Sequence, residues 1–379
     1  MKMKIQNLLV LSIIPILLVF QNCSSKSNPT ISNGNDSVIA PTPTPTPTPT
    51  CSLSEKEAEL TAAMTAATTD EVPVPDFSFL IERGDGRQFI YNRGSSTPDT
   101  IYESASTSKW VTAVIILRLV DKGILSLDDK PQDYIPGWPI TSGQPLYNMT
   151  LRNLLSFTSG LTEDHFCSNN PSANFFTCVT NVANANAANT MTPGSEFYYS
   201  SSHLLVAGAM AIKAYGKSSW QDLFTEFKTE TGLFSTSTYD LPSSTNPRLA
   251  GGMHWTGNEY FAFIKAFKNG SLLSATLMNE MLTDQTASAT IVNSPIAVVN
   301  QVWHYGFGSW QECQDPLNYS CAPGTRISSP GAYGAYPFWD RAKSYFGILA
   351  RQGDLGTFRK GVELENPLRP YIEAWVNCN

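Results

Sequence analysis

Ser106 and Lys109 stand three residues apart in the stretch SASTSK, residues 104–109, which directly precedes the apolar run WVTAVIILRLV. If Ser106 begins a helix, both side chains project from the same helix face, one turn apart. Burial against an apolar helix disfavours the charged ammonium and lowers the pKa of Lys109, so this lysine can accept the proton of the Ser106 hydroxyl. The positive potential at the helix N-terminus favours the alkoxide that forms. The pattern therefore predicts a serine nucleophile that is activated by a lysine base.

A purely structural interpretation of the same residues stays open. Ser104 or Ser106 can cap the helix while Lys109 lies in solvent. Two features favour the catalytic interpretation: no other S-x-x-K occurs in the chain, and this one lies between a predicted hairpin and a predicted buried helix. A Ser-His-Asp arrangement is not expected, because no G-x-S-x-G occurs and the four histidines stand in unmatched contexts.

The elements around this motif follow from apolar patterns and turn residues. Two apolar runs flank Gly84-Asp85-Gly86 in FSFLIERGDGRQFIYNRG and predict a β-hairpin. In CSLSEKEAELTAAMTAATTD, Ser54 and Glu57 have the spacing of a capping box, which predicts an opening helix. TLRNLLSFTSGL and SSHLLVAGAMAIKAYG predict helices, and NPLRPYIEAWVNC predicts the last one. Strand patterns occur at SPIAVV, WHYGFGSW, GAYGAYPFW and YFGILAR.

This order of elements predicts an α+β fold, or α/β sandwich. Strands from both ends of the chain are expected to pair into one antiparallel sheet that is flanked by helices. The loop-rich middle, about residues 125–245, is expected to form a mostly helical second lobe within a domain of residues 51–379. A cleft between two such lobes is a usual place for an active site.

The stretch IYESASTSKWVTAVIILRLVDKGILSLDD, residues 101–129, resembles the active-site helix of the β-lactamase-related serine hydrolases. That family includes class C β-lactamases, D-alanyl-D-alanine carboxypeptidases and family VIII carboxylesterases. LRNLLSFTSGL, PGSEFYYSSSHLLVAG, AGGMHWTGNEYFAF and HYGFGSW resemble later segments of the family, with Phe157 where histidine is common. The resemblance covers roughly residues 75–352 and implies a β-lactamase/transpeptidase-like fold.

The second motif of this family, Y-x-N, implies Tyr199 and Ser201 as site residues. Tyr198 and Tyr199 are adjacent and give two registers, of which the spacing to the small residue Gly208 selects Tyr199. A tyrosine near a lysine can be held partly as phenolate or can relay a proton, so the resemblance implies that Tyr199 passes the proton to the leaving group. Ser201 stands at the asparagine position and still offers a hydroxyl. Taken alone, Tyr199 would be interpreted as a core aromatic.

The third motif of the family, K-T-G or H-x-G, is matched by SSPGAYGAYPFWD, in which Ser329-Pro330-Gly331 stands at the motif. The resemblance implies that the backbone amides of Ala332 and Ser106 form an oxyanion hole, and that Gly331 lets the substrate backbone approach closely. A second register, with the class C spacing, places Arg326-Ile327-Ser328 at the motif instead.

The uncharged third motif affects the expected substrate. The usual lysine and threonine help to bind a substrate carboxylate, whereas Ser329 and Pro330 carry no charge, and the sequence does not place Arg326 or Arg351 as a substitute. We therefore expect an exported, esterase-like serine hydrolase that cleaves a small-molecule ester or amide through an acyl-enzyme on Ser106. One alternative is a β-lactamase or D-alanyl-D-alanine carboxypeptidase that acts on penicillins or cell-wall peptides. Another is a non-catalytic surface lipoprotein with the same fold.

The N-terminal residues predict export. Residues 1–22 have two lysines before an apolar stretch and resemble a lipoprotein signal peptide, with Cys23 at the lipidation position. The alternative is an ordinary signal peptide with an incidental cysteine. Residues 23–50 are polar and include PTPTPTPTPT, which predicts an extended spacer. The expected location is the cell envelope, with the domain lipid-anchored on the periplasmic face or the outer surface.

Seven cysteines fit an oxidising compartment, and six remain if Cys23 carries lipid. Spacing suggests three disulfides, although some cysteines could instead be free buried thiols: Cys167 with Cys178, Cys313 with Cys321, and Cys51 with Cys378. Neither CxxC nor HExxH occurs, so no metal site is expected, and the resemblance implies no cofactor. A net charge of −7 without a basic stripe argues against nucleic-acid binding. The domain is expected to be a monomer.

Overall fold

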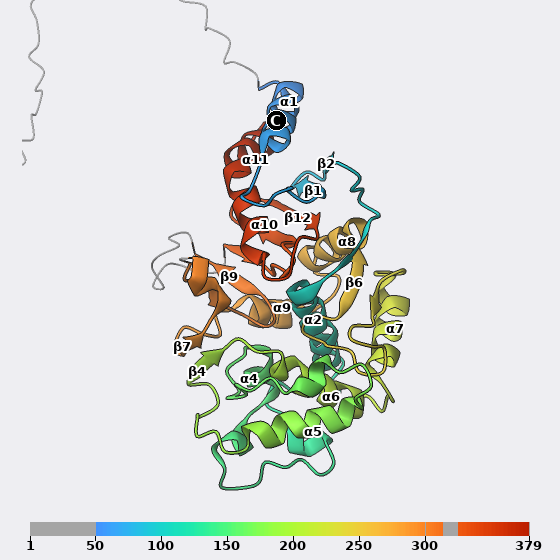
Figure 1. Cartoon of the computed structure of the whole chain (residues 1–379), viewed down its shortest axis with the longest axis vertical. Helices are drawn as coiled ribbons and strands as arrows, with labels where there is room; N and C mark the ends of the chain where they lie inside the picture. The colour runs from blue at the N-terminus through green and yellow to red at the C-terminus, as the bar shows by residue number, and fades with distance from the viewer. Residues whose placement is uncertain (1–50, 300, 314–324, 379) are drawn as a thin grey trace, which may run out of the picture. The chain divides into compact units, whose positions relative to one another are not determined.

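A computed structural model describes residues 51–299, 301–313 and 325–378 (Figure 1). Its central feature in these ranges is a seven-stranded antiparallel sheet in the order β2-β1-β12-β11-β10-β9-β8. The strands are β1 (Phe77–Arg83), β2 (Gln88–Arg93), β8 (His304–Tyr305), β9 (Trp310–Glu312), β10 (Arg326–Ser328), β11 (Tyr336–Asp340) and β12 (Tyr345–Arg351). Because β1 from the start of the domain pairs with β12 from its end, the predicted fold class is confirmed.

Helices cover the sheet on two faces, as the alternation of side chains along β12 requires. Phe346 of β12 stacks on Phe261 of helix α8 (Gly257–Lys268). The adjacent Tyr345 lies toward Arg326, which pairs with Glu365 at the end of helix α10 (Phe358–Glu365). Helices α1 (Leu53–Ala66) and α11 (Arg369–Val376) pack together beside α10 (Figure 1). Both faces of the sheet are therefore buried.

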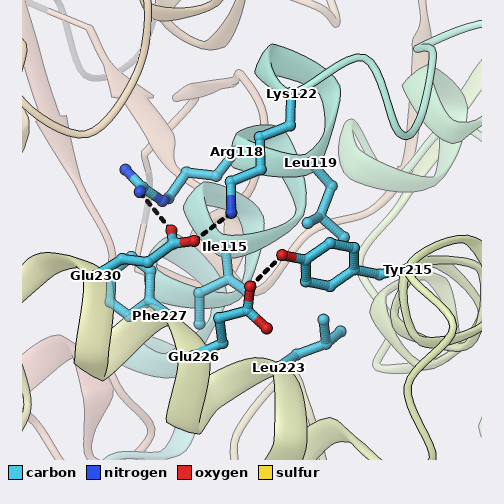
Figure 2. Close-up of a pocket in the computed structure, with 9 residues that line it drawn as sticks. All are labelled: Ile115, Arg118, Leu119, Lys122, Tyr215, Leu223, Glu226, Phe227 and Glu230. Carbon is cyan, nitrogen blue, oxygen red and sulfur yellow. Dashed lines mark hydrogen bonds and ion pairs between the residues drawn. The ribbon is translucent and has the colours of Figure 1, made fainter.

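Helix α2 (Ser108–Asp121) is the buried helix that the apolar run predicts, and most of its residues are buried. It packs against α6 (Ser202–Ala214) and α7 (Trp220–Thr231). Figure 2 shows how its far end is held, with Arg118 and Lys122 both directed at Glu230 of α7. Because both cations are paired with Glu230, the small hollow beside them is a structural junction and does not resemble a catalytic site.

The remaining elements mostly lie in the middle of the chain. The other helices are α3 (Pro131–Tyr134), α4 (Leu151–Leu155), α5 (Phe175–Asn186) and α9 (Ala275–Leu282), with the 3-10 helices η1 (Ala105–Thr107), η2 (Pro145–Asn148), η3 (Phe166–Asn169), η4 (Pro295–Val299) and η5 (Asn366–Leu368). Two small sheets contain β3 (Ile101–Glu103), β6 (Met253–Thr256) and β5 (Thr238–Tyr239), and β4 (Glu196–Tyr198) with β7 (Thr290–Asn293).

Two local predictions need correction, and a third, for a strand, is confirmed in finer detail. SPIAVV is not a strand: it forms η4, and the strand of this region is β7, which precedes it and pairs with β4. The cap of α1 is Ser52 instead of Ser54, because the Ser52 hydroxyl accepts the Glu55 amide at the same spacing two residues earlier. WHYGFGSW forms two short strands, β8 and β9, around a turn at Gly308.

Two of the three predicted disulfides are present in the structure. Cys51 and Cys378 join the first described residue to the last, and Cys167 and Cys178 close a short loop. Cys321 lies outside the described residues, so its pairing with Cys313 stays a prediction. Cys23, the signal peptide and the spacer of residues 23–50 also lie outside them. Within the described ranges, no helix combines the length and apolarity needed to cross a membrane.

Candidate active site

Ser106 lies in the middle of η1, the single 3-10 turn that leads into α2. The α-helix begins at Ser108, two residues later than the sequence suggests, yet Lys109 remains on the same side of the turn. Ala105 has a φ of 43°, in the left-handed region that non-glycine residues adopt at a cost of about 1 kcal/mol or more. Ala105 is thus strained. Ser106 is half-buried, and its two neighbours, Ala105 and Thr107, are buried.

Lys109 is held against Ser106 in a dry environment. Its Nζ lies 2.8 Å from Ser106 Oγ and 2.8 Å from the carbonyl oxygen of Ala250. Burial lowers the pKa of Lys109 to about 7; the charge of Asp164 opposes this shift and that of Arg248 adds to it. Lys109 does not lie in solvent, and the N-cap of α2 is Thr107 without a side-chain cap. The structural alternative of a capped helix with a solvated lysine is therefore wrong.

Tyr199 completes the contact with the same hydroxyl. A side-chain hydrogen bond joins it to Ser106, and its ring centroid lies 4.7 Å from Lys109 Nζ. Burial raises the pKa of Tyr199, so the expectation of a partial phenolate needs correction: the phenol is neutral and can donate its proton. The competing Tyr198 has another role, because its carbonyl oxygen accepts from Nε2 of His203.

Aromatic packing fixes the orientation of Tyr199. Its ring stacks on Trp310 at a centroid distance of 5.3 Å and meets Phe157 at 5.5 Å. Its backbone amide donates to the Asn293 carbonyl at 3.0 Å. Phe157, at the position where the family commonly has histidine, also stacks on His203. These contacts leave the ring little freedom to rotate, so the Tyr199 hydroxyl stays directed at Ser106.

The segment from Ser329 to Ala332 lies beside the nucleophile. Ser329 Oγ donates to the Ser106 carbonyl oxygen at 3.0 Å, so this hydroxyl holds the Ser106 turn and does not face a substrate. A Cβ on Gly331 would come within 2.5 Å of the Ser104 carbonyl oxygen. This glycine therefore allows the close approach of the Ser104 turn, a reason that the sequence did not suggest, while its predicted role toward the substrate stays a prediction.

Ala332 and Ser201 line the pocket that contains Ser106. Among the described residues, no acceptor takes the Ala332 amide hydrogen, which leaves it available to an oxyanion. Ser201 is the N-cap residue of α6, and its amide donates to Asp164 at 2.9 Å. Asp164 also accepts from the amide and hydroxyl of Ser202, so this carboxylate holds the start of α6.

The pocket has a volume of about 320 Å³. Its lining includes the loops on either side of the nucleophile: Glu103, Ala105, Ser106, Lys109, Ser201, Leu241, Pro242, Arg248, Ala250, Gly251, Ala332, Tyr333 and Leu355. Arg326 and Arg351, the two arginines considered from the sequence, lie elsewhere. Arg326 pairs with Glu365 at 2.7 Å, and Arg351 pairs with Glu71 at 2.6 Å. The register that places Arg326 at the third motif is thus not the one beside Ser106.

The four histidines have structural partners. His203 is buried between Ser159 Oγ and the Tyr198 carbonyl oxygen, and burial lowers its pKa to about 4. His254 pairs with Asp240, His304 with Asp284, and His165 accepts the Cys167 amide. In the described ranges no three His, Cys, Asp or Glu residues gather in a way that could hold a metal.

Sequence reasoning missed three residues of this site. Ala105 gives no sign of a left-handed backbone, because alanine is not a residue that signals it. Asp164 and Arg248 come from segments far from Ser106 in sequence, and neither belongs to a spacing pattern that marks chemistry. Only the fold places their charges near Lys109.

Comparison with known proteins gives a family match and several similar folds. The Beta-lactamase family matches residues 80–361. A structure described as a putative beta-lactamase from Bacteroides dorei is 25% identical, with a TM-score of 0.67 over 86% of this chain and 100% of that chain. The hydrolase EstCE1, described as having promiscuous acyltransferase activity, is 17% identical, with a TM-score of 0.64 over 85% and 98%, which shows the fold alone.

A curated relative, penicillin-binding protein 4 of Amycolatopsis lactamdurans, is 35% identical over 78 residues. That match covers 20% of this chain and 20% of the relative, so the chain spans only a fifth of the length of that protein.

Proposed function

We propose that this chain, which belongs to the Beta-lactamase family, is a serine hydrolase that cleaves esters or amides through an acyl-enzyme on Ser106. The observation that carries this proposal is the 2.8 Å contact between Lys109 Nζ and Ser106 Oγ in a site where burial brings the pKa of the lysine to about 7. An amine with such a pKa is partly unprotonated near neutral pH and can act as the base.

The proposed reaction begins when unprotonated Lys109 accepts the proton of Ser106 and Oγ bonds to the acyl carbon. The carbonyl oxygen becomes an oxyanion that the amides of Ser106 and Ala332 stabilise. Tyr199 donates its proton to the leaving alkoxide or amine and regains one from Lys109. Water then attacks the acyl-enzyme and gives one proton to Lys109. Lys109 passes this proton to Ser106 Oγ as the bond between Oγ and the acyl carbon breaks, which releases the acid and restores the Ser106 hydroxyl.

An esterase-like activity is favoured over that of a β-lactamase or a D-alanyl-D-alanine carboxypeptidase. Those two substrate classes carry a carboxylate that the third motif of the family usually binds, and the Ser329-Pro330-Gly331 segment has no cation at that position. Arg326 and Arg351 do not replace that cation, because both are buried in ion pairs with glutamates. The non-catalytic alternative gains no support from a site in which Ser106, Lys109 and Tyr199 are in contact.

The proposal includes export and a lipid anchor on Cys23. The apolar leader, the cysteine that follows it and the Pro-Thr spacer support this location. The disulfides Cys51–Cys378 and Cys167–Cys178 suit an oxidising compartment.

The test uses an uncharged fluorophosphonate probe and the Ser106→Ala variant. Wild-type protein should be labelled on Ser106, and Ser106→Ala should not be labelled at all. Ser172→Ala, which removes an exposed serine hydroxyl, is the matched control and should label like wild type. Undiminished labelling of Ser106→Ala would remove Ser106 from the mechanism. A stable adduct with a labelled penicillin, without turnover of p-nitrophenyl esters, would favour the carboxypeptidase alternative.

A further inference from the structure

Arg248 is a cation in the active-site pocket that lacks a partner. It lies on the loop between β5 and β6 and lines the pocket together with Ser106 and Lys109. Among the described residues, no carboxylate or carbonyl oxygen pairs with its guanidinium, and its Nε is buried without a hydrogen bond. A buried, unpaired donor of this kind costs free energy unless a ligand satisfies it.

The backbone of Arg248 is held firmly although its side chain is not. Its amide donates to the Leu241 carbonyl oxygen at 2.8 Å, and its own carbonyl oxygen accepts from Gly251 and Gly252 at 3.0 and 2.6 Å. A Cβ on Gly252 would come within 2.2 Å of the Leu241 oxygen, so the loop has no room to rearrange. The guanidinium is therefore presented to the pocket from a fixed base.

The charges in the pocket limit what Arg248 can bind. Glu103 is the acidic residue in the lining, and its carboxylate already takes a hydrogen bond from the hydroxyl of Tyr333. No ion pair within 4.0 Å joins Glu103 to Arg248. The negative charge of Glu103 offsets that of Arg248 in the pocket as a whole, but among the described residues no carboxylate pairs with the guanidinium, so its donors stay available to a ligand. That balance suits a group with a single negative charge better than a dianionic phosphate.

We propose that Arg248 is a specificity-determining residue that binds a carboxylate of the substrate. The inference rests on the proposed function, and it narrows the substrates to esters or amides whose carboxylate lies at another position than the one that the third motif binds in β-lactams and D-alanyl-D-alanine peptides. The cation comes from the loop between β5 and β6, not from the Ser329–Ala332 segment. The substrate would thus lie in the pocket with its carboxylate toward that loop and its carbonyl carbon at Ser106.

The pH dependence that Lys109 gives to the reaction provides a second readout. The charge of Arg248 helps to lower the pKa of Lys109, whereas Asp164 acts in the opposite direction; Tyr199 and the Ala250 carbonyl also face the amine. Removing the guanidinium should therefore move the acidic limb of the pH profile to higher pH. A structural role for Arg248 would not produce this shift together with a loss confined to one charge class of substrate.

The experiment compares Arg248→Gln and Arg248→Lys with wild type on two matched substrate pairs. One pair is p-nitrophenyl hydrogen glutarate and its neutral methyl ester, with the charge on the acyl side. The other is 4-carboxyphenyl butyrate and its methyl ester, with the charge on the leaving group. Arg248→Gln should lower kcat/KM for the anionic member of one pair by about 10- to 100-fold, mainly through KM, and change the neutral member by less than about threefold. Arg248→Lys should keep part of the preference.

Arg87→Gln is the matched control, since it removes the same charge from an exposed turn. It should leave the ratio of kcat/KM between the anionic and the neutral member unchanged in both pairs. Equal losses on charged and neutral members, or no loss on either pair, would overturn the role of Arg248. Labelling by the uncharged fluorophosphonate distinguishes a failure of the role of Arg248 from a failure of the proposed function. If wild type and Arg248→Gln label equally but show no anionic preference, only this inference fails. If wild type does not label on Ser106, the proposed function itself fails.

Discussion

Lys109 Nζ lies over the ring of Tyr199, 4.7 Å from its centroid, while both side chains reach the hydroxyl of Ser106. An aromatic face stabilises a cation, yet the burial that this ring helps to create disfavours the charged amine more strongly, and the pKa of Lys109 falls to about 7. The same burial keeps the phenol of Tyr199 protonated. One neighbour is thus prepared to take a proton and the other to give one.

The first prediction concerns pH. Because Lys109 must be unprotonated to act as base, kcat/KM on a neutral ester should fall about tenfold per pH unit below a limb near pH 7. Asp164 stabilises the ammonium, so Asp164→Asn should lower the pKa of Lys109 and move the limb to lower pH. Stopped-flow rates of acylation between about pH 5 and pH 9, a range that covers the relevant pKa values, would measure the limb in the wild type and in Asp164→Asn. A limb that moves to higher pH in Asp164→Asn would contradict the assignment of Lys109 as the base.

The second prediction concerns the role of Tyr199 as proton donor. Tyr199→Phe keeps the ring that stacks on Trp310 but removes the hydroxyl, so kcat should fall by about 10²- to 10⁴-fold with little change in melting temperature. Tyr198→Phe is the control, because it changes the competing register and should have a small effect. The opposite pattern, with a strong loss in Tyr198→Phe alone, would show that the wrong tyrosine has been assigned.

The third prediction concerns the close approach at Gly331. An added Cβ within 2.5 Å of the Ser104 oxygen and 3.0 Å of Thr107 Cγ2 must displace the turn that carries Ser106. Gly331→Ala should therefore slow fluorophosphonate labelling by about tenfold or more and destabilise the fold by about 1 to 3 kcal/mol. Gly84→Ala, where the nearest atoms lie at 3.5 Å, should do neither. Normal labelling of Gly331→Ala would mean that the turn does not depend on this contact.

The fourth prediction concerns Arg326. This arginine is buried and binds Glu365, Asp340 and the hydroxyl of Tyr345. Arg326→Gln leaves carboxylates without their partner, so the free energy of unfolding should fall by about 3 to 5 kcal/mol. Urea denaturation would measure this loss of stability. The folded protein should retain its preference among substrates, which kinetics at low temperature would measure. A changed preference with unchanged stability would return Arg326 to the list of substrate-binding residues.

The sequence was sufficient for the features that depend on local periodicity and spacing. The hairpin of β1 and β2, the buried helix α2 and the strand β12 follow from runs of apolar residues. The contact between Ser106 and Lys109 follows from their spacing of about one helical turn. SPIAVV shows the limit, since its apolar run is short enough to form a 3-10 helix as readily as a strand.

The rest of the site depends on contacts between segments that are distant in the chain. The pocket includes Arg248 from the loop before β6 and Leu355 from the loop after β12, and no local pattern brings them to Ser106. The reason for Gly331 was also beyond the sequence, because a glycine does not disclose whether a substrate or a neighbouring backbone needs the space.

The tight fit of Gly331 on the Ser104 turn has a consequence for protein engineering. The half of the pocket that contains Ser106 is built from backbone in close contact and should tolerate almost no change in a mutant library. The half formed by Arg248, Tyr333 and Leu355 consists of side chains from separate loops. Directed evolution toward new acyl groups should therefore concentrate its diversity on those three positions and leave the nucleophile turn intact.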